Sequence, residues 1–341
     1  MRILFLGGTR FIGIPAVRQL VALGHEVVVF HRGKTTAELP SSVKHLYGDH
    51  AQLPDFREEF RQVSPDVVVD MVAHTEHDGN MLQEVFQGLA KRLVVISSVD
   101  VYRAYDRFRN VVTGDIEITP LREDSPLRDR YFPYQDSTKS ADDFYNRYDK
   151  ILMERTVQSA PNLLPATVLR LPMVYGTSDY QHRTFPYLKR MTEGRKYILL
   201  SEGQADWCGT RGYVEDTGLA ITLCALSEQA VGRTYHVADL DNATEYEWVE
   251  RIARAVGWTG EIVVLPQSSL PVHLQDEYEY RQSWSLDTSR IREELGYQEV
   301  VSSEIAMERT IAWQRNHTPK EVKESDFDYE AEDAALAAFR S

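Results

Sequence analysis

Residues 2–24 read RILFLGGTRFIGIPAVRQLVALG, and this stretch decides the fold. Its first five residues, Arg2–Leu6, are mostly apolar and predict a buried strand, which Gly7 and Gly8 end. Between Phe11 and Leu23 apolar residues recur at helical spacing, and Gly24 is the residue type that commonly ends a helix. The chain therefore opens with a strand, a glycine-rich turn and a helix.

The same alternation continues along the chain. Further buried strands are predicted at residues 26–30, 43–47, 66–72, 92–97 and 166–170, with helical patterns between them. Strands that alternate with helices form βαβ units with right-handed crossovers and a parallel sheet. The predicted fold class is α/β, a Rossmann-type doubly wound parallel sheet with a smaller C-terminal lobe over the carboxyl ends of its strands.

The turn after the first strand is typical of a phosphate-binding loop. A helix that begins directly after glycines presents backbone N–H groups and its positive end to a pyrophosphate. The first glycine permits the tight turn and the last lets the helix pack close to the sheet, while Arg10 occupies the middle position of the usual glycine fingerprint. The residues expected to contact a dinucleotide here are Gly7, Thr9, Arg10, Phe11, Ile12 and Gly13.

The end of the second strand bears on the choice between NAD and NADP. An acidic residue for the ribose 2′-hydroxyl of NAD is absent from Val29-Phe30-His31-Arg32. Arg32, Lys34 and Arg10 are placed to surround a 2′-phosphate instead, so NADP is favoured over NAD. The alternative is that Arg32 is only a solvated loop residue. Asp49, after the third strand, is placed to reach the adenine amine.

The rest of the chain divides by pattern. Residues 103–135 are rich in Arg, Asp, Tyr and Pro and predict a long excursion from the sheet. Helices are predicted over 142–158, 245–256 and 303–315. We expect a dinucleotide-binding domain over 1–175, a mainly substrate-binding lobe over 176–316 with some segments returning to the sheet, and a loosely packed acidic tail over 317–341.

Composition excludes several classes of function. The chain has 341 residues, of which 43% are hydrophobic, and a formal net charge of -14. Such a charge argues against nucleic acid and anionic lipid as partners. The two cysteines, Cys208 and Cys224, have no metal-binding spacing, so no metal site or disulfide is expected, and a reduced, cytoplasmic setting fits. No apolar run reaches the length of a membrane span.

The order and spacing of several motifs resemble the extended short-chain dehydrogenase/reductase family, the NAD-dependent epimerases and dehydratases. The resemblance covers about residues 1–316, and the Arg inside the glycine loop is similar to an atypical branch that includes chloroplast stem-loop RNA-binding proteins. The motifs are the glycine loop, Gly48-Asp49, Ser97-Ser98-Val99-Asp100-Val101-Tyr102, Arg170-Leu171-Pro172-Met173-Val174-Tyr175-Gly176, Tyr213-Val214-Glu215-Asp216, Tyr235-His236-Val237 and Leu295-Gly296-Tyr297.

The resemblance implies a Ser–Tyr–Lys proton-transfer site. Ser98 and Lys150 match the family serine and lysine, but Asn146 stands where the tyrosine is expected. Tyr148 is taken as the surrogate; on a helix it would lie about 160° from Lys150, so it can serve only if the helix begins near residue 148. Tyr134, Tyr145, or no tyrosine at all remain alternatives.

Other contacts follow from the same resemblance. The cofactor is expected to touch His50, Val72, Lys150 and Pro172, and Arg211 is expected to contact a substrate diphosphate, two residues after the family position, which is Gly209 here. Asp100 keeps one member of the acidic pair of sugar-nucleotide dehydratases and is interpreted as a loop hydrogen-bonding residue.

The function implied is an NAD(P)-dependent epimerase or reductase that acts on a sugar by hydride transfer, with a sugar nucleotide as the expected substrate. The alternative is a cofactor-binding protein of the atypical branch without redox turnover, regulatory or RNA-associated. A homodimer is left open.

Overall fold

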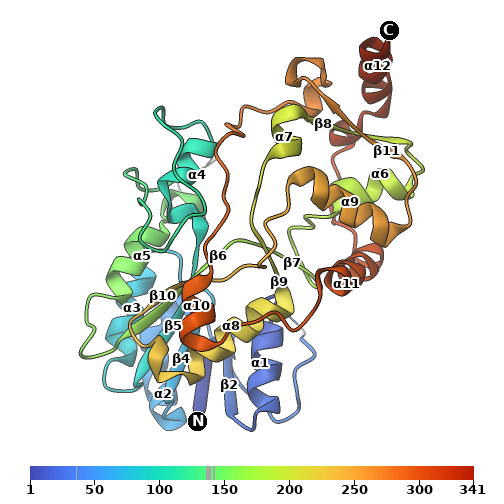
Figure 1. Ribbon diagram of the computed structural model, residues 1–341. Coiled ribbons are helices and arrows are strands. Elements are labelled where there is room, and N and C mark those ends of the chain that lie inside the picture. The colour runs from blue at the N-terminus through green and yellow to red at the C-terminus, as the bar shows by residue number, and fades with distance from the viewer. Residues whose placement is uncertain (36, 136–139, 141–142) are drawn as a thin grey trace.

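The computed structural model describes residues 1–35, 37–135, 140 and 143–341. Its centre is a seven-stranded parallel sheet in the order β10-β6-β5-β4-β1-β2-β3 (Figure 1). The reversal of strand order between β1 and β4 is that of a doubly wound Rossmann sheet, which confirms the predicted fold class. The strands are β1 (Arg2–Leu6), β2 (Glu26–His31), β3 (Lys44–Tyr47), β4 (Val67–Asp70), β5 (Arg92–Ser98), β6 (Ala166–Leu171) and β10 (Thr234–His236).

Helices cover both faces of this sheet. Successive residues of β1 belong to two different cores, because side chains alternate across a strand: Ile3 and Phe5 face one, and Leu4 and Leu6 the other. The first core includes residues of α1 (Gly13–Ala22) and α8 (Val214–Leu226). The second includes residues of α2 (Arg57–Val63), α3 (Glu76–Phe86) and α5 (Lys150–Val157). Both faces are thus buried, which explains the continuous apolar strands.

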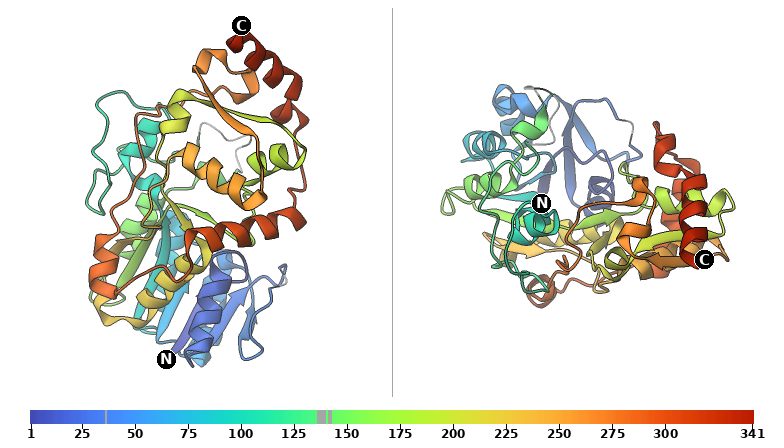
Figure 2. Two further views of the ribbon diagram at one scale, coloured as in Figure 1. Left: turned by 45° about the vertical axis from the view of Figure 1, so that its right-hand side comes forward. Right: turned by 90° about the horizontal axis from the view of Figure 1, so that it is seen from above.

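A smaller lobe lies beyond the carboxyl ends of the strands (Figures 1 and 2). Two short parallel pairs, β7–β9 and β8–β11, belong to it. The helix predicted over 245–256 is confirmed, and the one predicted over 303–315 extends to Asn316. The bounds are β7 (Met173–Tyr175), β8 (Tyr197–Ser201), β9 (Arg211–Tyr213), β11 (Glu261–Leu265), α6 (Phe185–Thr192), α7 (Glu202–Asp206), α9 (Glu245–Val256) and α11 (Ser303–Asn316). Between these segments the chain returns to the sheet through α8, β10 and α10 (Ser289–Leu295).

The helix predicted over 142–158 is wrong at its start. Residue 142 lies outside the described residues, and 144–146 form a separate 3-10 turn. The α-helix begins only at Lys150, because the Asp149 carboxylate accepts hydrogen bonds from the backbone N–H groups of Ile151 and Leu152 and caps it. Tyr148 is therefore an extrahelical residue, and helical spacing does not apply to it.

The acidic tail, predicted to pack loosely, is mostly exposed but ends in a helix that contacts the lobe. Residues 329–340 form helix α12 (Tyr329–Arg340), on which Glu332 and Leu336 are buried. The Glu332 carboxylate forms an ion pair with Arg190 of α6, at 2.7 Å between Oε1 and Nη2. The acidic composition of the tail gave no sign that Glu332 and Leu336 face inward. The buried ion pair of Glu332 attaches this helix to the lobe.

The predicted excursion over 103–135 contains the short helix α4 (Arg103–Phe108) and an irregular segment after it. Within the described ranges, no helix is both long and apolar enough to cross a membrane.

The junction between sheet and lobe carries a half-buried acid, Asp239, that makes stability depend on pH. The backbone N–H of Tyr213 donates to Asp239 Oδ1 at 2.9 Å, and burial raises the pKa of Asp239 to about 7. A carboxyl group whose pKa is raised by folding stabilises the fold while protonated, so this contribution is lost as pH rises from about 4 to about 7. In Asp239→Asn, the unfolding free energy is expected to fall less steeply as the pH rises over that range.

Denaturant titrations of parent and variant at several pH values measure this difference. Burial also raises the pKa of the neighbouring Asp216, to about 6, so part of the pH dependence is expected to remain in the variant. Identical slopes in the two proteins would contradict the assignment.

Candidate functional site

The main cleft of the molecule lies at the carboxyl ends of β1, β2, β4 and β5, where doubly wound sheets bind ligands. Its volume is about 980 Å³. Cofactor and small-molecule sites commonly measure about 300–1,000 Å³. Its walls come from the glycine loop, the ends of β2 and β3, residues 71–78, the end of β5, and residues within 144–152 and 171–183.

The glycine loop is shaped by its glycines. Gly7 and Gly8 have φ angles of +86° and +93°, in the left-handed region that glycine adopts without strain. Gly13 has a different role, because a Cβ atom there would lie 2.3 Å from the Cα of Gly8. The loop and the first turn of α1 therefore touch through their backbones, which leaves the positive end of α1 at the loop.

Most residues predicted to contact the cofactor line this one cleft: Gly7, Thr9, Arg10, Phe11, Ile12, Arg32, Asp49, His50, Val72, Lys150 and Pro172. Gly13 instead packs behind the loop. The Asp49 carboxylate accepts a hydrogen bond from the backbone N–H of Ala51 at 3.1 Å, so one of its oxygens is already used locally.

Two basic residues that follow β2 line the cleft. Arg32 and Lys34 are exposed and line it. The Arg10 guanidinium stacks over the ring of Tyr180, 5.1 Å from its centre, and both residues line the same cleft. These cations can approach a phosphate without leaving a buried partner unpaired.

An ion pair between a residue that lines the cleft and the end of β4 was missed from the sequence. His50 Nε2 lies 2.6 Å from Oδ2 of Asp70, the last residue of β4. Burial lowers the pKa of His50 but the Asp70 carboxylate outweighs it, and the net pKa is raised. Asp70 also accepts the backbone N–H groups of Val72 and Ala73, at 2.7 and 2.6 Å, and so fixes the turn that follows β4.

The three side chains predicted to transfer protons reach the wall of the same cleft: Ser98, Tyr148 and Lys150. Ser98 ends β5 and Lys150 begins α5. Tyr148 reaches the cleft because the chain is not helical at this point. Its side chain is only 8% exposed.

Lys150 is held between two strand ends. Its ammonium donates to the carbonyl oxygen of Ala73 at 2.6 Å and to that of Ile96 at 2.8 Å. Burial lowers the pKa of Lys150 to about 8. Close by, burial also lowers the pKa of His74 to about 3, so this imidazole is neutral at physiological pH. His74 lines the cleft and was not predicted.

The alternative tyrosines differ in their surroundings. Tyr145 is 48% exposed, and the Asn146 amide donates to the carbonyl oxygen of Ser140 at 2.8 Å. Tyr134 is half-buried next to Tyr148, with ring centres 5.1 Å apart. The hydroxyl groups of Tyr148 and Tyr134 both donate to Oδ2 of Asp100, at 2.7 and 2.9 Å.

Asp100 is therefore more than the loop residue that the sequence indicated. It is 3% exposed and forms the centre of a buried polar network. The signal in the sequence was the acidic residue two positions after Ser98, but nothing there linked it to a tyrosine 34 or 48 positions later.

Arg211 lies away from the main cleft, in contrast to its predicted role. Its guanidinium is buried, donates to the Glu245 carboxylate and to the carbonyl oxygen of Gly209, and stacks over Trp248 at 4.3 Å. A cation paired in this way stays bound within the lobe, because breaking a buried ion pair would leave a charge without a partner in the interior. Glu245, the partner, begins α9 and could not be identified by motif spacing.

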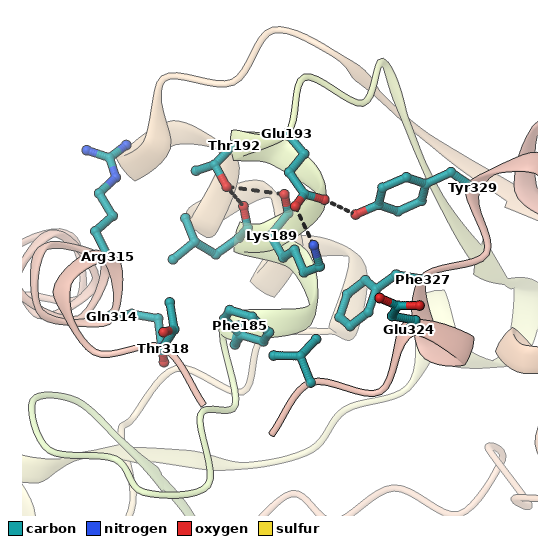
Figure 3. A pocket seen from close by; sticks show the side chains of 12 residues that line it. Phe185, Lys189, Thr192, Glu193, Gln314, Arg315, Thr318, Glu324, Phe327 and Tyr329 are labelled. Atoms are coloured by element: carbon teal, nitrogen blue, oxygen red, sulfur yellow. Dashed lines mark hydrogen bonds and ion pairs between the residues drawn. The ribbon is translucent and has the colours of Figure 1, made fainter. Parts of the chain in front are cut away.

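A second cavity, of about 770 Å³, lies between α6, the end of α11 and the C-terminal segment (Figure 3). Three of its polar groups bind one another: the Lys189 ammonium binds the Glu193 carboxylate, which also accepts the Tyr329 hydroxyl at 2.5 Å. No element of the glycine loop takes part. This cavity is not the candidate active site.

The main cleft fits a dinucleotide on three counts: a glycine loop at a helix start, enough volume, and basic residues at the end of β2. Groups of three or more metal-ligating side chains do not occur among the described residues.

Comparison with known proteins agrees with this geometry. Residues 3–238 match the profile of the NAD dependent epimerase/dehydratase family. A 2'-dehydrokanamycin reductase from Streptomyces kanamyceticus is 25% identical over 284 residues, 81% of this chain and 72% of that protein. A dTDP-glucose 4,6-dehydratase from Haemophilus influenzae is 21% identical, over 92% of this chain and 97% of that protein. The Bordetella bronchiseptica enzyme WbmG, solved in complex with NAD and UDP, has a similar fold, with a TM-score of 0.68, 18% identity, and coverage of 93% and 95%.

Proposed function

Because the chain belongs to the NAD dependent epimerase/dehydratase family, we propose that it is an NAD(P)-dependent epimerase or reductase acting on a hydroxyl-bearing or keto carbon of a sugar. One observation carries the proposal: the glycine loop and the side chains of Ser98, Tyr148 and Lys150 line a single cleft. A bound nicotinamide would supply or accept a hydride. The chain itself must then bind the dinucleotide, orient the sugar and move one proton.

The protein groups divide these tasks. In this proposal the loop from Gly7 to Gly13 and the start of α1 bind the pyrophosphate, and Lys150 holds the nicotinamide ribose, a role that its two carbonyl contacts at the cleft support. Ser98 is the hydrogen-bonding partner for the substrate oxygen, and Tyr148 is the proton donor or acceptor. We also propose residues 1–175 as the dinucleotide-binding domain and the lobe within 176–316 as the part that contacts the substrate.

Relatives support a sugar as substrate. One is named for the reduction of a dehydrokanamycin and another for the dehydration of a dTDP-linked glucose. A nucleotide-linked substrate is the proposed class, but the burial of Arg211 against Glu245 removes the cation that was expected to bind its diphosphate. Other residues of the lobe must then bind these phosphates.

The test is a screen of keto sugars, free and nucleotide-linked, in which turnover is measured as the loss of reduced-nicotinamide absorbance. Turnover with any of them supports the proposal. Lys150→Met should remove it, because the variant keeps the chain volume but loses the ammonium. Lys189→Met is the matched control, since Lys189 borders the second cavity and its loss should leave turnover unchanged. Failure of the parent protein to bind either dinucleotide would overturn the proposal.

NADPH is expected to bind more tightly than NADH. Arg32 and Lys34 place positive charge at the end of β2, where an acid would favour the 2′-hydroxyl. Arg32→Asp should reverse the preference, because a carboxylate repels the 2′-phosphate and accepts a hydrogen bond from the 2′-hydroxyl. Calorimetric titrations of both proteins with both cofactors measure this. Arg18→Asp is the charge-matched control on α1 outside the cleft. Stronger binding of NADH by the parent would refute the preference.

A cofactor-binding protein without turnover is the second candidate, favoured by Asn146 at the regular tyrosine position. Tight dinucleotide binding together with no turnover across the screen would support it. The net charge of -14 disfavours an RNA-associated version. Dinucleotide that co-purifies with the protein would instead favour an epimerase over an exchanging reductase.

A further inference from the structure

Four polar side chains form a continuous hydrogen-bonded chain behind the wall of the cleft. The hydroxyl of Tyr105, on α4, donates to that of Tyr134 at 2.8 Å. The hydroxyls of Tyr134 and Tyr148 both donate to Oδ2 of Asp100, at 2.9 and 2.7 Å. Tyr148 lines the cleft, so this chain runs from the cleft into the interior of the excursion.

Asp100 is poorly equipped to carry a negative charge. Its side chain is buried, and in the part of the chain that the structure describes no donor lies within hydrogen-bonding distance of Oδ1. An ionised carboxylate with one bare oxygen in a buried site is costly, and protonation removes that cost.

The two cations that attract this carboxyl group, Arg128 and Lys150, donate hydrogen bonds to main-chain carbonyl oxygens. The Arg128 guanidinium donates through Nε to the main-chain carbonyl oxygen of Asp100, and its Nη1 lies 3.7 Å from the carboxylate of Asp149. Lys150 donates to two carbonyl oxygens, and Asp106 of α4 adds a nearby carboxyl group. Burial, the largest influence, raises the pKa of Asp100 despite the attraction of Arg128 and Lys150.

We propose that Asp100 is a positioning residue that holds the hydroxyl of Tyr148 at the cleft and stores the proton that Tyr148 delivers. This inference rests on the proposed function and replaces one part of its expected chemistry. In the family pattern a lysine ammonium eases ionisation of the tyrosine. Here the ammonium of Lys150 is bound to the carbonyls of Ala73 and Ile96, and the phenol of Tyr148 is bound to a carboxyl group.

The proton step balances without a tyrosinate that persists. When a substrate carbonyl carbon receives a hydride from reduced nicotinamide, its oxygen takes the phenolic proton of Tyr148. For this step the acid proton must be carried on Oδ2 of Asp100, across the 2.7 Å contact with the Tyr148 oxygen, which leaves the phenolic proton of Tyr148 free for the substrate oxygen. The Tyr148 oxygen then takes the proton from Oδ2, and Asp100 is left as a carboxylate. Tyr134 donates to that carboxylate, and Arg128 offsets its charge. Oxidation of a hydroxyl group runs through the same atoms in reverse. Burial and the Asp100 carboxyl raise the pKa of Tyr148, which agrees with a phenol that passes a proton on rather than losing it.

Infrared spectroscopy tests the stored proton without any substrate. A protonated carboxyl group has a carbonyl stretching band that an ionised one lacks. The parent protein should show such a band at neutral pH, and Asp100→Asn should remove the part that Asp100 contributes, while the contribution of Asp239, with a pKa of about 7, should remain. Tyr148→Phe and Tyr134→Phe should keep the band and shift it to higher frequency, because each removes one donor from the carboxyl oxygen. Tyr145→Phe is the control, since this exposed tyrosine should leave the band unmoved.

The outcomes are distinct. The inference would be overturned if no carbonyl band at neutral pH shifts in response to Tyr148→Phe and Tyr134→Phe. If Asp100→Asn fails to fold, those two tyrosine variants still identify the group by their shifts. Calorimetry with NADPH tests the proposed function separately, because the parent should bind it whether or not Asp100 is protonated.

Kinetics then test delivery of the proton with any substrate from the screen. Asp100→Asn should keep the affinity for NADPH but lower turnover about 10²–10⁴-fold and change its pH profile, the effect of removing an acid–base group. Parental turnover and pH profile in a folded Asp100→Asn would refute the delivery role and leave the proposed function intact.

Discussion

The affinity for NADPH is expected to fall about 10²–10⁴-fold when Gly13 is replaced by Ala, the loss of two charge-assisted hydrogen bonds of about 1.5–3 kcal/mol each. The added Cβ would lie 2.3 Å from the Cα of Gly8, and 2.8 Å from its carbonyl carbon and oxygen. Because these are backbone atoms, the loop and the start of α1 must separate. The N–H groups that bind the pyrophosphate then lose their common orientation. Gly13→Asp should do the same and add a repelling charge.

Calorimetric titration with NADPH measures the loss, and thermal unfolding reports the cost in stability, about 1–3 kcal/mol for overpacking. Gly24→Ala is the matched control at the other end of the same helix. Gly24 has a φ angle of +82°, and nothing lies within 4 Å of the place that a Cβ atom would take. This variant should therefore lose stability through backbone strain but bind NADPH as the parent does. Parental affinity in a folded Gly13→Ala would place the pyrophosphate elsewhere.

Turnover is expected to fall about 10²–10⁴-fold in Tyr148→Phe, the usual contribution of a positioned acid–base group. Tyr148 lines the cleft and its hydroxyl is hydrogen-bonded to Asp100 at 2.7 Å. Removal of the hydroxyl therefore breaks the step by which that carboxyl group reaches the substrate in the proposed mechanism. The fold should survive, because the ring remains packed against Tyr134. Affinity for NADPH should also be retained.

Two further tyrosine variants make this experiment decisive. Tyr134→Phe should reduce turnover less, because Tyr134 supports Asp100 but does not line the cleft. Tyr145→Phe should have little effect, since its side chain is 48% exposed. A loss confined to Tyr134→Phe or Tyr145→Phe would move the acid to that residue. Parental rates for all three would mean that no tyrosine serves.

The sequence by itself determined the sheet and the glycine loop. The predicted strands at residues 2–6, 26–30 and 92–97 coincide with β1, β2 and β5 to within one residue, and the sheet is doubly wound as predicted. These features are local: a strand buried on both faces is a short apolar run, and the contact of Gly13 with Gly8 needs only five residues of chain. The loop around Gly7, Arg32 at the end of β2, and Ser98 at the end of β5 follow from the same local pattern.

The tertiary structure alone decided which side chains can do chemistry. Asp149 caps α5 and so releases Tyr148 from the helix on which periodicity had placed it. Asp100 meets Tyr148 and Tyr134, Arg211 meets Glu245, and Glu332 meets Arg190, each partner being between 34 and 142 positions away. A buried charge or phenol must find a partner, but nothing in local spacing names that partner, because it is the packing of separate elements that brings the two groups together.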